Sequence, residues 1–145
     1  MARDTPQKKC LAEVRFVTIG NRVHAMMIAA KVLFEKRYKF FKEEFKCNTQ
    51  LNWLVNTELY GIKKFCIEHW GKMLPRWATA LRNWGEAGVV KTKTKTTPQI
   101  AYRSITCMFV GYSVNHTDLL YRIWNPKSNC IRVSIYVTWI KYIYY

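Results

Sequence analysis

The sequence predicts an α+β protein, with helices in its first part and a small antiparallel β structure in its second. Two observations carry this prediction. Between Leu11 and Lys46, apolar residues recur at three- and four-residue steps, which is the spacing of amphipathic helices. From Gly71 onward, glycine and proline divide the chain into short pieces rich in β-branched and aromatic residues, as in small β domains.

Two long helices are predicted first. Leu11–Ala30 has the helical spacing of apolar residues, with Gly20 as its weak point. Lys31–Lys46 is predicted to be a second, basic helix with its apolar residues on one side. These residues are Leu33, Phe34, Tyr38, Phe41 and Phe45. A third, shorter helix is expected at Asn48–Tyr60, with Asn48 or Thr49 as its N-cap and a glycine at its end.

Four strands are predicted in the second part, spaced as in a small antiparallel barrel or meander. They are Ala87–Thr96, Thr106–Tyr112, Leu119–Trp124 and Cys130–Ile140. Asn125–Asn129 contains a proline and a serine and is a natural hairpin turn between the last two. Most of the tryptophans lie within apolar patterns, so we expect them to pack in the core rather than to stack on bases.

The composition is that of a folded protein that attracts polyanions. Half of the 145 residues are hydrophobic and 15% are aromatic, which argues against a disordered chain. The 24 Lys and Arg against 9 Asp and Glu give a net charge of +15. Nucleic acid is therefore the expected partner, and the alternative is that the lysines only keep an aromatic-rich chain soluble.

The cysteines and histidines predict neither disulfides nor a bound metal. The five cysteines are scattered singly without a C-x-x-C pair, and the three histidines do not stand at zinc-finger spacing from them. The apolar stretch Ala25–Ala30 is too short to span a bilayer and lacks the flanks of a signal peptide. We therefore expect a soluble, intracellular protein with reduced thiols and no membrane partner.

Glu13 is the one carboxylate whose context invites a catalytic interpretation. Judged by spacing alone, a helix-capping or helix-dipole role near the start of the first helix is the better reading. The chain has only Asp4 and Asp118 as further aspartates, and it contains no nucleophile elbow, phosphate-binding glycine loop or zincin motif. Binding is therefore favoured over catalysis.

Two groups of basic residues are candidates for nucleic-acid contact. Strict alternation places Lys91, Lys93 and Lys95 on one face of a predicted strand, where they can follow a phosphate backbone. Alternatively, these lysines only protect an edge strand from aggregation. The second group lies on the predicted basic helix and consists of Lys36, Arg37, Lys39 and Lys42.

Several blocks, in this order and spacing, resemble the Pol polyprotein of copia-type LTR retrotransposons. They are Thr5-Pro6-Gln7 with Glu13, Leu81-Arg82-Asn83-Trp84-Gly85, Met108-Phe109-Val110-Gly111-Tyr112, Tyr121-Arg122-Ile123-Trp124-Asn125-Pro126 and Val137-Thr138-Trp139. The resemblance implies that residues 1–65 are a helical remnant of the integrase catalytic core. It also implies that residues 83–141 form the retroviral polymerase SH3-like domain, a small antiparallel β-barrel.

In that family the Thr-Pro-Gln stretch leads to the metal-binding Glu of the integrase Asp-Asp-Glu triad, which Glu13 resembles. The two Asp partners are missing, so the resemblance implies a non-catalytic fragment, with magnesium expected only for a complete core. Its expected role is non-specific DNA binding, related to DNA integration and transposition. The alternatives are a protein-interaction module that docks on other Pol segments, or a decayed copy with no selected function.

Overall fold

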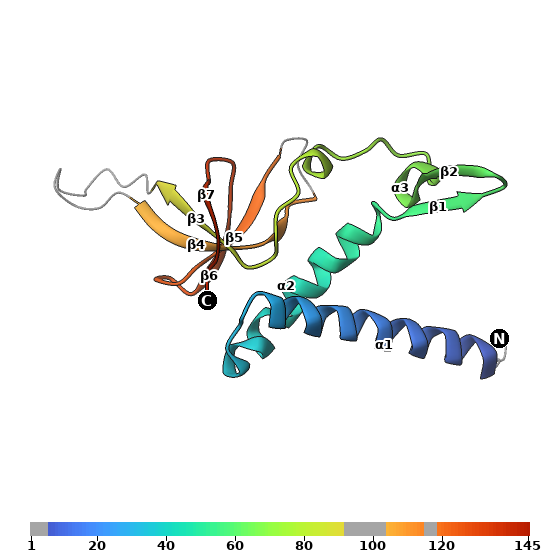
Figure 1. The fold of residues 1–145 in the computed structure, drawn as a ribbon, viewed down its shortest axis with the longest axis horizontal. Helices are drawn as coiled ribbons and strands as arrows, with labels where there is room; N and C mark the ends of the chain where they lie inside the picture. Colours follow the sequence, from blue (N-terminus) through green and yellow to red (C-terminus); the bar gives the residue numbers. More distant parts are fainter. Residues whose placement is uncertain (1–5, 92–103, 115–118) are drawn as a thin grey trace.

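The computed structural model is an α+β protein in which two long helices precede a sheet (Figure 1). It describes residues 6–91, 104–114 and 119–145. The helical elements are α1 (Pro6–Ala29), α2 (Phe34–Asn52), the short α3 (Cys66–His69) and a 3-10 turn, η1 (Arg76–Thr79). The strands are β1 (Asn56–Leu59), β2 (Ile62–Phe65), β3 (Glu86–Lys91), β4 (Ser104–Tyr112), β5 (Tyr121–Asn125), β6 (Cys130–Ser134) and β7 (Thr138–Ile143). The predicted order of helices and then antiparallel strands is confirmed.

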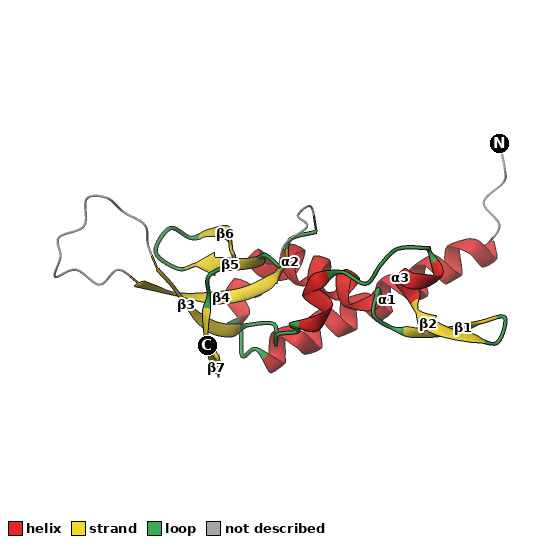
Figure 2. Ribbon diagram, turned by 90° about the horizontal axis from the view of Figure 1, so that it is seen from above, coloured by secondary structure: helices red, strands yellow, loops and turns green. Residues whose placement is uncertain are grey.

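Both predicted long helices are present, with shifted ends. α1 begins at Pro6, whose fixed φ and missing N–H suit the first helical position, and it continues through Gly20 without a break. Lys31, with a positive φ of 53°, follows the helix and turns the chain back toward α2. α2 runs on past Lys46 to Asn52. The sheet lies at one end of the molecule, and α1 and the β1–β2 hairpin extend toward the other end (Figure 2).

The predicted third helix at Asn48–Tyr60 is wrong. α2 continues through Thr49, whose hydroxyl donates to the Phe45 carbonyl (2.9 Å) instead of capping a new helix. The residues after α2 form the antiparallel β1–β2 hairpin. Its turn is Tyr60-Gly61, with φ angles of 54° and 76°. Two consecutive positive φ angles are typical of a type I′ turn, so Gly61 closes a hairpin rather than a helix.

Strands β3 to β7 form one antiparallel sheet in the order β6-β5-β4-β3-β7. The predicted strands Thr106–Tyr112 and Leu119–Trp124 correspond to β4 and β5, and the expected turn joins β5 to β6. β3 matches Ala87–Thr96 as far as Lys91, and the rest of that prediction lies outside the described residues. The single strand predicted at Cys130–Ile140 is wrong, because β6 and β7 are separate strands.

The sheet is strongly curled. β6 and β7 lie at its opposite edges, yet only residues 135–137 separate them in the sequence. The edges of a flat five-stranded sheet are about 19 Å apart, at roughly 4.8 Å per strand spacing. The four steps from Ser134 to Thr138 cover at most about 14 Å. The two edges must therefore approach each other here, although β6 and β7, both fully described, do not pair and the sheet stays open.

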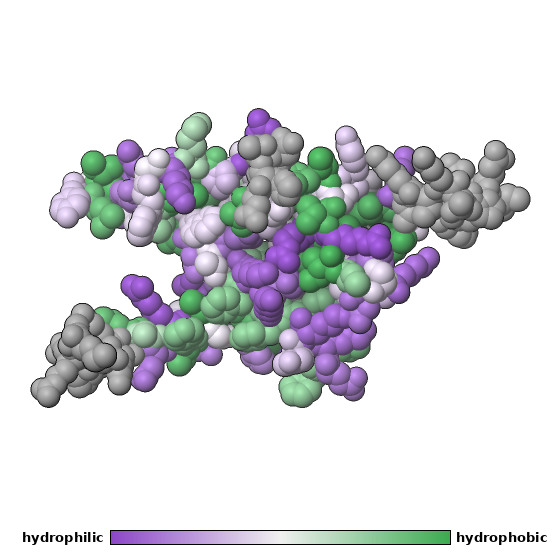
Figure 3. Space-filling view, turned by 180° about the vertical axis from the view of Figure 1, so that it is seen from behind, coloured by the Kyte–Doolittle hydropathy of each residue, from purple (hydrophilic) through white to green (hydrophobic). Residues whose placement is uncertain are grey.

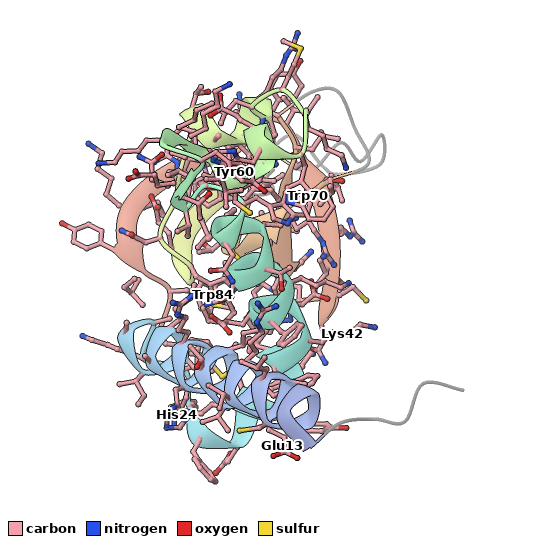
Figure 4. The ribbon with its side chains drawn as sticks, turned by 90° about the vertical axis from the view of Figure 1, so that its right-hand side faces the viewer. Glu13, His24, Lys42, Tyr60, Trp70 and Trp84 are labelled. Carbon is pink, nitrogen blue, oxygen red and sulfur yellow. The ribbon has the colours of Figure 1, made fainter. Side chains whose placement is uncertain are left out.

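One hydrophobic core holds the helices on the sheet. Phe40 of α2 is buried edge-to-face against Trp84 and Trp124, with ring centroids 6.1 and 5.1 Å away. Trp84 lies between the helices and the sheet (Figure 4). Next to it, Gly85 approaches α1 so closely that an added Cβ would be 2.5 Å from the Cβ of Ala30. Helices and sheet therefore share buried residues rather than forming separate cores.

A second core lies on the other face of the sheet, because alternate residues of β4 point to opposite faces. Phe109, Tyr121 and Trp139 meet edge-to-face there, with centroids 5.1 to 6.2 Å apart. Tyr112 stacks on Trp77 of η1 at 4.9 Å. The sequence blocks that carry the resemblance thus supply aromatic residues to both cores, as expected for most of the tryptophans.

The side of α2 that contacts the core is not the side on which its apolar residues gather. Its buried residues are Phe40, Glu43, Glu44, Cys47, Asn48 and Gln50. Gln50 fixes this orientation, because its side-chain amide donates to the Tyr112 carbonyl (2.9 Å) and accepts from the Tyr112 N–H (3.4 Å). As a result, Phe34, Tyr38 and Phe41 are exposed.

Candidate nucleic-acid interface

Two of the four basic residues predicted on the second helix lie against aromatic rings of β5 and of the C-terminal residue. The Lys36 ammonium is 5.7 Å from the ring centroid of Trp124 and 5.3 Å from that of Tyr145. Lys39 also lies over Trp124, at 5.7 Å, and its ammonium contacts the Asn129 side chain and carbonyl. These cation–π contacts and hydrogen bonds hold both ammonium groups on the sheet side of α2.

The other two, Arg37 and Lys42, line a groove between α1 and α2. Arg37 is fixed there, because its Nε–H donates to the Val32 carbonyl (3.2 Å) and its guanidinium lies 5.7 Å from the Phe34 ring centroid. Lys42 is exposed. The structure thus holds Lys36 and Lys39 against Trp124 and places Arg37 and Lys42 in the groove, which Lys39 also lines.

Ion pairing and burial leave the outer surface of α2 strongly positive. Glu43 is buried and pairs with Arg122 of β5 (Oε2–Nη2 2.6 Å) and with Lys46 (Oε1–Nζ 3.8 Å). Glu44 is buried as well. Across α2, which is described throughout, Glu35 is the one exposed carboxylate beside five basic residues. This surface favours a polyanion.

Glu44 is a carboxylate without a partner in the core. Its side chain is fully buried, and neither carboxylate oxygen has a hydrogen-bond partner in the described part of the chain. Burial raises its pKa from the usual 4.5 to about 7. Burial, and then the nearby Glu44 carboxylate, raise the pKa of the Cys47 thiol to about 12, so this thiol is not a reactive thiolate.

The predicted lysine stripe is only partly visible. Lys91 is the last residue of β3, is exposed, and pairs in register with Ser104 of β4. Lys93 and Lys95 lie outside the described residues. The end of β3 is at the far end of the sheet, away from α2, so Lys91 and the basic residues of α2 lie on separate surfaces (Figure 1).

Glu13 lies exposed near the N-terminal end of α1, well away from the sheet (Figure 4). The residues that the structure describes include no group of three His, Cys, Asp or Glu side chains that could hold a metal ion. Asp4 and Asp118 fall outside the described ranges. The structure thus brings no second carboxylate of the described ranges into a metal site with Glu13.

The exposed aromatic residues of α2 were not foreseen as part of a site. The helical pattern groups Phe34, Tyr38 and Phe41 on one side, and such a stripe ordinarily packs in a core. In the structure they are exposed and interleaved with the basic residues. The sequence signal for them is this alternation of aromatic and basic residues, which is common on nucleic-acid-binding surfaces.

No protein-family model, curated protein or solved structure matches this chain. Among the described helices, none is long and apolar enough to cross a membrane.

Proposed function

We propose that this chain is a non-catalytic segment of a copia-type retrotransposon Pol polyprotein that binds nucleic acid without sequence preference. In this proposal it runs from the end of the integrase core into the SH3-like domain. The order of the sequence blocks supports the relationship. The strong curl of the five-stranded sheet is compatible with a small SH3-like barrel.

The observation that carries the binding role is the outer surface of α2. The helix carries five basic residues and one exposed carboxylate, while its other two carboxylates are buried. Lysine and arginine contacts to phosphates supply affinity but read no sequence. DNA of any sequence is the expected ligand.

Catalysis is not part of this proposal. Two-metal phosphoryl transfer requires several carboxylates to hold the ions, and Glu13 alone cannot do so. Magnesium would enter only with a complete integrase core that supplies the two missing aspartates.

The test is the salt dependence of binding to labelled duplex DNA, followed by fluorescence anisotropy. Two variants are compared: Lys91→Gln/Lys93→Gln/Lys95→Gln, and Arg37→Gln/Lys42→Gln. Each lost phosphate contact should flatten the slope of log affinity against log salt by about one unit, equally for different DNA sequences. Lys64→Gln, at an exposed lysine of β2, is the matched control. Wild-type affinity that does not depend on salt would contradict the proposal.

A second candidate function is docking on another segment of the polyprotein. It is favoured by the N-terminal half of α1, where apolar side chains face solvent, as the view from behind shows (Figure 3). These are Leu11, Val14, Phe16 and Val17, each more than half exposed. Binding of a Pol segment that persists at high salt and is lost in Phe16→Ser would support docking, because apolar contacts are not screened.

A further inference from the structure

The aromatic stripe of α2 is an unusual surface for a protein in water. Phe34, Tyr38 and Phe41 are 81%, 93% and 50% exposed. They are spaced four and three residues apart, so they lie on one face of the helix. The exposed rings therefore form a continuous strip rather than scattered side chains.

The strip forms one wall of an open groove. Val23, His24 and Met27 of α1 form the opposite wall, and Arg37, Tyr38 and Phe41 are among the lining residues of α2. At 1.5 Å per residue, the part of α2 from Phe34 to Phe41 is roughly 10 Å long. That length matches about three stacked bases at 3.4 Å each.

Cations accompany the rings along the strip. Arg37 lies over Phe34, and Lys42 follows Phe41 directly in the chain and lines the same groove. Lys36 and Lys39, by contrast, lie over Trp124. The cations that line the groove are Arg37, Lys42 and Lys39, with His24 on the opposite wall, but the Lys39 ammonium is already held by Trp124 and Asn129.

We propose that this groove binds single-stranded nucleic acid, with unpaired bases stacked on Tyr38 and Phe41 and the phosphate backbone held by Arg37 and Lys42. The inference rests on the proposed nucleic-acid-binding function and adds its substrate class. Aromatic rings interleaved with cations bind single strands, because every unpaired base offers a π face and every nucleotide a phosphate. In a duplex the bases are paired and stacked inside, so exposed rings add nothing to its affinity.

Charge favours this occupant over a second copy of the chain. Each copy carries a net charge of +15, and two basic strips facing each other would repel. A polyanion neutralises Arg37 and Lys42 instead.

The test compares a twelve-nucleotide oligothymidylate with a duplex of the same length, by fluorescence anisotropy. Tyr38→Ser should weaken binding of the single strand at least about fivefold, since stacking contributes roughly 1–3 kcal/mol per base. Duplex binding should change less than twofold. Tyr38→Trp should retain single-strand binding. Tyr142→Ser is the matched control, because Tyr142 is also largely exposed (74%) but lies on β7.

The outcomes separate the inference from the function on which it rests. If Tyr38→Ser leaves the affinity for the single strand unchanged, or lowers the affinities for single strand and duplex equally, the groove is not a base-stacking site. The chain would still bind nucleic acid. If the wild-type chain binds neither ligand, the proposed function fails with it. A wild-type dimer in sedimentation that Tyr38→Ser converts to a monomer would assign the strip to self-association and overturn the inference. Melting temperatures close to the wild type would show that the variants are folded.

Discussion

Glu44→Gln is expected to change how the stability of the protein depends on pH. The folded-state pKa of Glu44 is raised to about 7 from its usual 4.5, so the folded protein holds a proton that the unfolded chain releases between these values. Stability contributed by Glu44 is therefore complete below about pH 4.5, falls as the pH rises, and is lost above about pH 7. The shift of about 2.5 units corresponds to at most about 3 kcal/mol.

The assay is urea unfolding followed by tryptophan fluorescence, with wild type and Glu44→Gln measured in parallel from pH 5 to pH 8.5. Glutamine has the shape of the protonated acid but cannot ionise. The variant should match the wild type near pH 5 and exceed it above pH 7 by up to about 3 kcal/mol. Because other titrating groups are common to both proteins, the difference between the two curves reports Glu44 alone.

Parallel curves would refute this reasoning. They would mean that Glu44 keeps the same proton affinity in the folded and unfolded chain. A variant that is equally destabilised at every pH would instead show that the carboxylate accepts hydrogen bonds that glutamine cannot replace. In either case ionisation of the buried Glu44 carboxylate would not destabilise the folded protein.

Three further predictions concern the core and Glu13. Gly85→Ala should lower the free energy of unfolding by about 1–3 kcal/mol, because the added Cβ would overlap the Cβ of Ala30. Gly20→Ala should raise the free energy of unfolding by about 0.5–1 kcal/mol, because nothing lies within 4 Å of the added Cβ. Urea unfolding of both variants measures this contrast. Phe40→Ala should lower the free energy of unfolding by about 3–5 kcal/mol. If helices and sheet unfold together, circular dichroism and tryptophan fluorescence should report the same unfolding transition. The wild-type chain should show no strand transfer with magnesium or manganese, and a metal-dependent activity abolished by Glu13→Gln would contradict this.

Much of the fold could be predicted because strong local patterns agree with the final structure. The helical periodicity that ends at Ala30 is α1, and Asn125–Asn129 is the turn that joins β5 to β6. The predictions failed where tertiary geometry decides. No glycine or proline marks residues 135–137, where the chain crosses from one edge of the sheet to the other, so one strand was predicted instead of two. Thr49 was expected as a cap because sequence cannot show that its hydroxyl bonds within α2.

The candidate site was predictable in composition but not in arrangement. The sequence shows that Lys36, Arg37, Lys39 and Lys42 belong to one basic helix. It does not show that two of them are held over Trp124, because that ring comes from a strand far along the chain. Pairings of this kind depend on how the helix docks, which local periodicity does not encode.

The orientation of α2 is the feature that links the core to the proposed site. Turning the helix about its axis would bury Tyr38 and Phe41 and release Glu44 to solvent, which simple amphipathicity favours. The bonds of Gln50 to Tyr112 and the packing of Phe40 against two tryptophans prevent this turn. Each large aromatic ring left in water loses about 1.5–3 kcal/mol of the stabilisation that burial would give it. Desolvation of the buried Glu44 carboxylate destabilises the fold further. Exposed apolar rings and a buried carboxylate on one helix conflict with simple amphipathicity, as is expected at functional sites. A ligand that stacks on the rings would bury them and so recover this stabilisation in the complex.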